Sequence, residues 1–261
     1  MKSISSKIIL LAVFLGVLIS SCNKKHDDPQ PVQIPVETAK PQNVTFKFKP
    51  VKGDSSINFY STFRTGAGVR FNLSMYRYYL SNIKLVKNDG SEYSIADKYL
   101  LVTPNIEEYS LGEVPAGDYK GIKFSVGIDS ATNHKDPTFY PNTSPLSIQS
   151  PAIHWSWNSG YIFMMIEGTC DTTSTGNDVL TYGRFSKDMF FHIGLDKHYR
   201  QVSLNKSFNI SSSPQTITIM ADIDKFWTNV DLKTENQTHS FSNTELAKKV
   251  ADNFPNMFTV Q

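Results

Sequence analysis

The strongest constraint on the fold is a pattern that repeats from Val44 onward, in which short β-prone runs are separated by glycine or proline. Residues 44–48 alternate apolar and polar side chains, as a strand with one buried face does. The other predicted strands are 76–86, 98–102, 119–126, 161–167, 185–193 and 216–221. Turn sequences such as Asn88-Asp89-Gly90 lie between them. The pattern predicts a mainly-β domain over residues 44–261, built as an antiparallel β-sandwich or Greek-key barrel.

One segment near the C-terminus has helical spacing instead. Ser242 is followed three residues later by Glu245, which resembles a capping box. Leu246, Val250 and Phe254 then repeat at helical intervals, and Pro255 is expected to end the run. We therefore expect one short C-terminal helix beside the β domain.

The N-terminus predicts export and lipid attachment. Lys2 and Lys7 precede an apolar run over residues 8–19, which is shorter than the roughly 20 residues that span a bilayer. The sequence Leu18-Ile19-Ser20-Ser21-Cys22 resembles the lipobox of bacterial lipoproteins; the alternative is a buried cysteine after a hydrophobic helix. We expect residues 1–21 to be a lipoprotein signal peptide. Lipid on Cys22 would then attach the protein to a membrane of the bacterial cell envelope, the outer membrane, facing the periplasm or the surface.

Composition argues against a nucleic-acid partner. Residues 22–43 contain four prolines among polar side chains and are expected to form a flexible tether. The chain has 26 basic and 24 acidic side chains, and loss of Lys2 and Lys7 with the signal peptide makes the two numbers equal. No basic stripe with interleaved aromatic residues is present, so we expect no binding to nucleic acid.

The sequence contains no recognisable catalytic motif. It has no glycine-rich phosphate loop, no His-Glu-x-x-His helix and no Gly-x-Ser-x-Gly turn, and its carboxylates are scattered. We therefore do not expect an enzyme. A hydrolase whose residues assemble only in space stays open as an alternative.

The unusual segment is residues 153–161, in which Trp155 and Trp157 would share one face of a strand. Two indoles on one face form a stacking platform, a dense core or an easily oxidised pair. His154 would point to the other face. His192 lies in an apolar strand end, where a histidine is either a hydrogen-bonded core residue or a ligand, and His239 precedes the helix. Histidines that converge from strands and loops would favour copper or zinc over calcium.

Several segments, in order, resemble the MbnP-like family, the periplasmic copper-binding proteins associated with methanobactin operons. The similarity extends from about Val44 to the C-terminus. The segments that carry it are Tyr78-Tyr79-Leu80-Ser81-Asn82-Ile83-Lys84-Leu85, Val114-Pro115-Ala116-Gly117-Asp118-Tyr119, Phe124-Ser125-Val126-Gly127-Ile128-Asp129, Trp155-Ser156-Trp157-Asn158-Ser159-Gly160-Tyr161, Glu167-Gly168 and Phe191-His192-Ile193-Gly194.

The resemblance implies a β-rich domain that binds copper through histidines, with His192 as the first candidate ligand and His239 as the second. It also implies that Trp155 or Trp157 is oxidised to kynurenine by a partner, a di-haem protein of the cytochrome c peroxidase type. The sequence departs from the family at Phe48, which is followed by Lys49-Pro50-Val51 where members often carry a histidine.

This departure leaves two outcomes. Either His154 or His134 completes the ligand set, or this branch has kept the fold and lost the metal. In the second case the chain would be a surface module that binds a ligand or an envelope protein through the face of Trp155 and Trp157. Cys170 falls in the polar stretch 169–176, where we expect a loop; its thiol would be a spare Cu(I) ligand or incidental.

Overall fold

The computed structural model of the protein describes residues 40–156, 158–173 and 187–261. The predicted signal peptide, the lipidation site Cys22, most of the predicted tether and Trp157 lie outside the described residues. Within the described ranges, no helix has both the length and the apolar character needed to cross a membrane.

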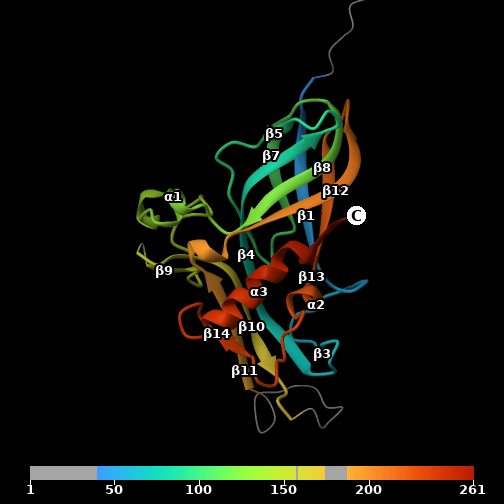
Figure 1. The fold of residues 1–261 in the computed structure, drawn as a ribbon. Coiled ribbons are helices and arrows are strands. Elements are labelled where there is room, and N and C mark those ends of the chain that lie inside the picture. Colours follow the sequence, from blue (N-terminus) through green and yellow to red (C-terminus); the bar gives the residue numbers. More distant parts are fainter. Residues whose placement is uncertain (1–39, 157, 174–186) are drawn as a thin grey trace, which may run out of the picture. The chain divides into compact units, whose positions relative to one another are not determined.

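The strands of the described residues form two sheets (Figure 1). The smaller sheet contains β1 (Gln42–Lys52), β2 (Ser55–Ser56), β7 (Glu108–Val114), β13 (Gln215–Asp222) and β15 (Phe258–Val260). The central path of the larger sheet is β12 (Arg200–Ile210), β8 (Gly117–Val126), β4 (Arg70–Lys87), β10 (Gly160–Cys170), β11 (Lys187–Gly194) and β14 (Gln237–Thr238). Four short strands extend it: β3 (Phe63–Arg64), β5 (Glu92–Ser94), β6 (Leu100–Val102) and β9 (His154–Ser156).

The predicted mainly-β sandwich is confirmed, and its sheets are mixed rather than purely antiparallel. β1 runs parallel to β13, and β11 runs parallel to β14. Parallel neighbours need a long connection between them, and both pairs are far apart in the sequence. Alternation predicted most of the long strands, but among strands of seven or more residues it missed β7 and β12, and it also missed short strands such as β2, β3, β5 and β15. In β12 the alternation of Val202 and Leu204 is lost in the polar stretch that follows, where the pairing with β8 shifts register.

Strand β4 separates two layers of apolar side chains. Tyr76 and Tyr78 point into the main core between the sheets, whereas Tyr79 belongs to a smaller cluster on the opposite face. A register shift between Ser81 and Lys84 reverses this parity, and Ile83 then points into the main core. The same strand therefore presents side chains to two separate environments.

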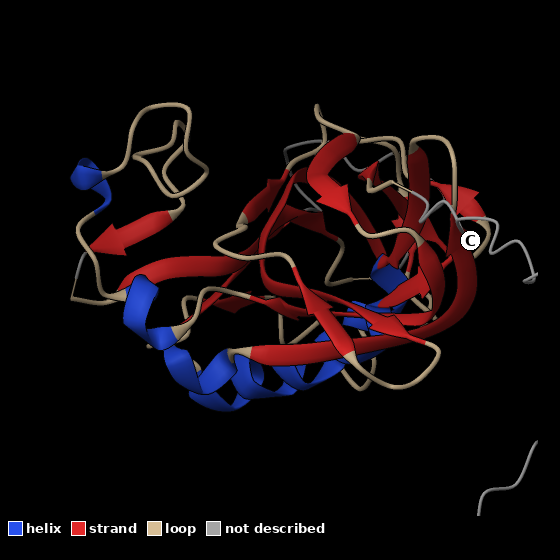
Figure 2. Cartoon of the chain, turned by 90° about the horizontal axis from the view of Figure 1, so that it is seen from above, coloured by secondary structure: helices blue, strands red, loops and turns tan. Residues whose placement is uncertain are grey.

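Three α-helices occur in the described residues: α1 (Ser130–Asn133), α2 (Ile223–Phe226) and α3 (Thr244–Met257). Two short 3-10 helices, η1 (Pro137–Phe139) and η2 (Asp196–His198), occur in connections. Figures 1 and 2 show α3, the longest helix, along the outside of the strands. Its buried face includes Leu246, Val250 and Phe254, as their spacing predicts.

The predicted ends of this helix need two corrections. The N-cap is Asn243, whose side chain accepts a hydrogen bond from the amide of Leu246, and Ser242 instead accepts a bond from the amide of His239. Asn243 is itself a favourable N-cap residue, and this explains how it replaces the serine. At the other end the helix continues through Pro255 to Met257, so the proline lies in the last turn and does not end the helix.

Candidate metal site

A cavity of about 580 Å³ lies on the face of the larger sheet that points away from the main core. Because side chains two residues apart share a face, Met75 of β4, Met165 and Glu167 of β10 and His192 of β11 emerge together there. Two connections complete the lining. The first is residues 151–155, which lead into β9, and the second is residues 239–241, which follow β14.

His192 lines the cavity, and one of its two ring nitrogens already makes a hydrogen bond. Its Nε2 is 2.8 Å from Oε1 of Glu167, the neighbouring side chain on β10. Burial lowers the pKa of His192 below its ordinary value of 6.5; the Glu167 carboxylate opposes this shift and His239 adds to it. The imidazole is therefore neutral at pH 7. If Glu167 accepts the proton of Nε2, the lone pair on Nδ1 stays available.

The parallel pairing of β11 and β14 places His239 beside His192. Phe190 pairs with Gln237 and Phe191 with Thr238, so the next register position brings the two histidines together. Their ring centroids are 4.7 Å apart, and His239 also packs on Phe190 at 4.4 Å.

Ser240 holds the end of β14 against β11. It has a left-handed backbone (φ 64°), and its hydroxyl donates to the carbonyl of His192 (3.1 Å). The same hydroxyl accepts from the amide of Gly194 (3.0 Å). This clamp keeps the segment that bears His239 next to the strand that bears His192.

His154 enters the cavity from β9, where it pairs with Tyr161 of β10. Its Nε2 is buried and has no hydrogen-bond partner among the described residues. Burial lowers the pKa of His154, so this imidazole is also neutral at pH 7. The segment is held in place by Arg77, whose guanidinium donates to the carbonyl of Pro151 (2.7 Å). An unpartnered buried nitrogen that faces a cavity is a free donor atom for a metal.

Trp155 lies next to His154 and also lines the cavity. The two rings have different neighbours, as alternation along a strand predicts: His154 packs on Tyr161 at 4.6 Å and Trp155 packs on Phe241 at 4.9 Å. The indole covers Gly194, where a Cβ atom would lie 2.6 Å from the indole ring. Trp155 is therefore fixed between the end of β11 and the connection after β14.

These observations can be compared with known proteins. The model of the MbnP family matches residues 41–243. The chain belongs to the MbnP family. Its structure is similar to that of MbnP from Methylosinus trichosporium, with a TM-score of 0.56 and 18% sequence identity over 77% of this chain and 84% of that one. At this identity the structural likeness shows the shared fold. No curated relative matches the sequence.

The predicted histidines divide into two groups in this MbnP-family fold. His192, His239 and His154 all line the cavity. His134, the other proposed substitute, is exposed at the end of α1, and its Nε2 lies 3.1 Å from Asp196. His198 is buried in η2, where its Nδ1 donates to the carbonyl of Gly194 (2.6 Å). His198 therefore has a structural partner and lies outside the cavity lining.

Cys170 does not lie in a loop. It ends β10 and is fully buried, with Sγ 3.5 Å from the carbonyl oxygen of Leu232. Burial raises the pKa of this thiol to about 11, so it stays protonated and is a poor metal ligand. It is also absent from the lining of the cavity. The expected loop is therefore wrong, because the strand continues further than its polar sequence suggested, and the burial of the thiol favours the incidental alternative over the spare ligand.

The residues that sequence reasoning missed are the two methionines and the carboxylate. Met165 and Glu167 alternate with buried Met164 and Ile166 on β10, so strand periodicity alone could have placed them on the outer face. Met75 could not be found this way, because only pairing with β10 brings it to the cavity. Within the described part of the chain, no three His, Cys, Asp or Glu side chains converge closely enough to form a metal site. Complete coordination would therefore need a thioether, a solvent molecule or movement of His154.

Proposed function

We propose that this protein binds copper in the cavity lined by His192, His239 and His154. One observation carries the proposal: three imidazoles from separate parts of the chain line the same cavity, and one of them has a buried Nε2 without a hydrogen-bond partner among the described residues. Membership of the MbnP family supports the choice of copper. A bound ion would give His154 the partner that the described residues do not supply.

The donor atoms around the cavity suit copper better than calcium or magnesium. Imidazole nitrogens and the thioethers of Met75 and Met165 are borderline to soft ligands, whereas calcium and magnesium select oxygen. Glu167 contributes by holding Nε2 of His192, a common way in which a carboxylate orients a metal-binding imidazole. Copper would supply a redox-active centre beside Trp155.

We also propose where the protein acts and with which partner. Lipid on Cys22 attaches it to the bacterial cell envelope, where it serves in copper acquisition or handling. Trp155 is the residue oxidised to kynurenine, by a di-haem partner of the cytochrome c peroxidase type. Support comes from the lipobox-like sequence, from family membership and from the position of Trp155 at the cavity.

The test is the copper content of the full-length protein, purified in detergent from the envelope of cells that also carry its native neighbouring genes. We expect about one copper per chain. His192→Gln should lower this content at least about tenfold, because loss even of a residue that only supports a metal ligand weakens affinity by about 10–100-fold. His154→Phe should also lower it without lowering the free energy of unfolding, because the lost Nε2 has no hydrogen-bond partner in the part of the chain that the structure describes.

His134→Gln is the matched control, because His134 is exposed and lies outside the cavity. It should leave copper content unchanged. An absence of copper in the unaltered protein, together with no uptake on titration, would refute the proposal. Equal loss in the His134 and His192 variants would refute the assignment of the cavity.

The same preparation tests the tryptophan. Peptide mass mapping should find the mass change of kynurenine at Trp155 when the di-haem partner is co-expressed, and unmodified tryptophan when it is omitted. A modification only at Trp157, or none with the partner present, would contradict this assignment.

One observation favours a second function, a surface module that binds a ligand or an envelope protein without metal. Phe241 is 54% exposed and packs against Trp155, which gives the cavity an apolar rim. For this alternative, Phe241→Ser would abolish partner binding in copper-free protein. Under the copper proposal, the same substitution would leave copper content unchanged.

A further inference from the structure

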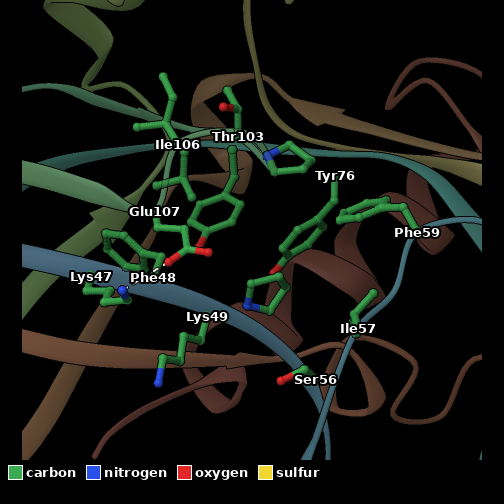
Figure 3. Close-up of a pocket in the computed structure, with 14 residues that line it drawn as sticks. Lys47, Phe48, Lys49, Ser56, Ile57, Phe59, Tyr76, Thr103, Ile106 and Glu107 are labelled. Atoms are coloured by element: carbon green, nitrogen blue, oxygen red, sulfur yellow. Dashed lines mark ion pairs between the residues drawn. The ribbon is translucent and has the colours of Figure 1, made fainter.

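A second cavity, of about 280 Å³, lies between the two sheets and on the other side of β4 from the candidate metal site. Its walls are residues 47–50 of β1, residues 56–59 after β2, and residues 102–107 between β6 and β7. Tyr76 and Tyr78 of β4 complete the lining. Figure 3 shows Tyr76 between Phe59 on one side and Phe48 with Glu107 on the other.

The unusual feature of this cavity is its pair of tyrosine hydroxyls. Tyr76 and Tyr78 are 3% and 0% exposed, and their ring centroids are 5.2 Å apart. Both hydroxyl oxygens are buried, and neither has a well-formed hydrogen bond to any described residue, although the two hydroxyls interact with each other. Buried hydroxyls in native proteins almost always have partners, so two without a well-formed hydrogen bond beside a single cavity require an explanation.

The other fully buried tyrosines of this protein show what is normal here. Tyr79, Tyr119 and Tyr161 each donate to a backbone carbonyl, at 2.9, 2.8 and 2.5 Å respectively. Among the described residues, a fully buried tyrosine that does not line this cavity therefore has a hydrogen-bond partner for its hydroxyl group. The exceptions, Tyr76 and Tyr78, are the two that line the inter-sheet cavity.

Both hydroxyls stay protonated and so can donate. Burial raises the pKa of Tyr76 and Tyr78 far above the usual value for tyrosine, and Asp222 adds to the shift at Tyr76. Two adjacent O–H donors match an acceptor with two lone pairs, and a carbonyl oxygen is such an acceptor.

The rest of the lining selects a neutral ring. Phe48, Phe59, Ile57, Val102 and Ile106 provide aromatic and aliphatic surface. Lys47 and Glu107 neutralise each other at 3.0 Å, and Lys49 extends away from Tyr76 (Figure 3). The volume is at the small end for ligand pockets, and this limits the occupant to about one ring.

We propose that the cavity between β1 and β4 binds a small, neutral aromatic carbonyl compound. The ring lies among Phe48, Phe59 and Ile57, and its carbonyl oxygen accepts hydrogen bonds from Tyr76 and Tyr78. This site is independent of the metal proposal, because Tyr76 and Met75 point to opposite faces of β4.

The experiment is a titration of the full-length protein with 4-fluoroacetophenone, followed by ¹⁹F NMR. Its matched probe is 1-ethyl-4-fluorobenzene, which keeps the ring and lacks the carbonyl. We expect saturable binding of the ketone, and binding of the hydrocarbon that is weaker by about tenfold or more, because a site built for hydrogen bonding discriminates against an analogue without the acceptor.

Variants test the tyrosines directly. Tyr76→Phe and Tyr78→Phe, singly and together, should weaken ketone binding to the level of the hydrocarbon without lowering the thermal midpoint. Tyr119→Phe is the control and should leave binding unchanged, because Tyr119 lies outside the cavity. No saturable binding of the ketone, equal binding of both probes by the unaltered protein, or full ketone binding by the double variant would overturn the proposal. Copper content measured on the same samples should not change.

Discussion

At the scale of the residue, the candidate metal site depends on which nitrogen atoms are already engaged. Glu167 occupies Nε2 of His192, while Nε2 of His154 has no partner. Both histidines lie on a strand, yet they offer different nitrogen atoms to a metal: Nδ1 in His192 and Nε2 in His154. His198 is a third case, because its hydrogen bond to the carbonyl of Gly194 makes it structural.

Gly194 gives a prediction at this scale. A Cβ atom there would lie 2.5 Å from the carbonyl oxygen of Tyr161 and 2.6 Å from the ring of Trp155. The carbonyl oxygen belongs to the backbone of a paired strand and cannot move away easily, so the added methyl group would clash with it. Gly194→Ala should therefore lower the free energy of unfolding by about 2 kcal/mol and displace the indole. Urea denaturation and tryptophan fluorescence measure the two effects.

Gly66→Ala is the control, since nothing lies within 4 Å of a Cβ at Gly66. It should change stability by less than about 0.5 kcal/mol. If both variants were equally stable and had the same fluorescence as the unaltered protein, the packing of Trp155 over Gly194 would be wrong.

At the scale of the element, the short strand β14 decides where His239 lies. Only two residues of β14 pair with β11, so the backbone hydrogen bonds between these two strands are weak by themselves. The Ser240 clamp and the helix that follows hold it in register. The N-terminus of α3 therefore contributes to the position of a candidate ligand.

The identity of the helix cap gives a prediction at this scale. Asn243→Ala removes the side-chain acceptor for the amide of Leu246 and should lower the free energy of unfolding by about 1 kcal/mol. Ser242→Ala should have a smaller effect, because its hydroxyl is 3.4 Å from the amide of His239 and does not cap the helix. Chemical denaturation of both variants decides between the two residues. A larger loss for the Ser242 variant would restore the capping box expected from the sequence.

At the scale of the whole described domain, the two faces of β4 contribute to two separate candidate sites. One face contributes Met75 to the candidate metal site, and the other contributes Tyr76 and Tyr78 to the inter-sheet cavity. Neighbouring residues of one strand thus line two candidate sites that share no side chain of β4. Substitutions at one site are expected to leave the other unchanged.

Acid sensitivity is a prediction for the domain as a whole. Burial lowers the pKa values of His154, His192 and His198, so below about pH 6.5 the unfolded chain binds protons that the folded chain does not. The free energy of unfolding of copper-free protein should therefore fall between pH 7 and pH 5, with a limit of about 1.4 kcal/mol per pH unit for each histidine. Urea denaturation across this range measures it.

The contribution of one histidine can be isolated with His198→Gln, which removes a buried titrating group outside the candidate metal site. Its stability should depend less steeply on pH than that of the unaltered protein. Equal slopes would show that His198 titrates alike in the folded and unfolded chains.

Local rules of the sequence determined the mainly-β class, most of the long strands and the C-terminal helix. Alternation with period two and helical spacing depend only on residues a few positions apart. The turn at Asn88-Asp89-Gly90 follows the same logic: Gly90 takes a left-handed backbone (φ 91°), and Asp89 accepts from the amide of Ser91. Such features need no knowledge of distant parts of the chain.

Only the tertiary structure decided which side chains meet. His239 reaches His192 through a parallel pairing between distant segments, and Met75 reaches Glu167 through the register of β4 with β10. The lack of partners for the hydroxyls of Tyr76 and Tyr78 could not be predicted from the sequence either. The sequence of a buried strand is the same whether or not a carbonyl from a distant segment lies near the tyrosine hydroxyl. Register and packing between sheets are long-range properties, and they place both candidate sites.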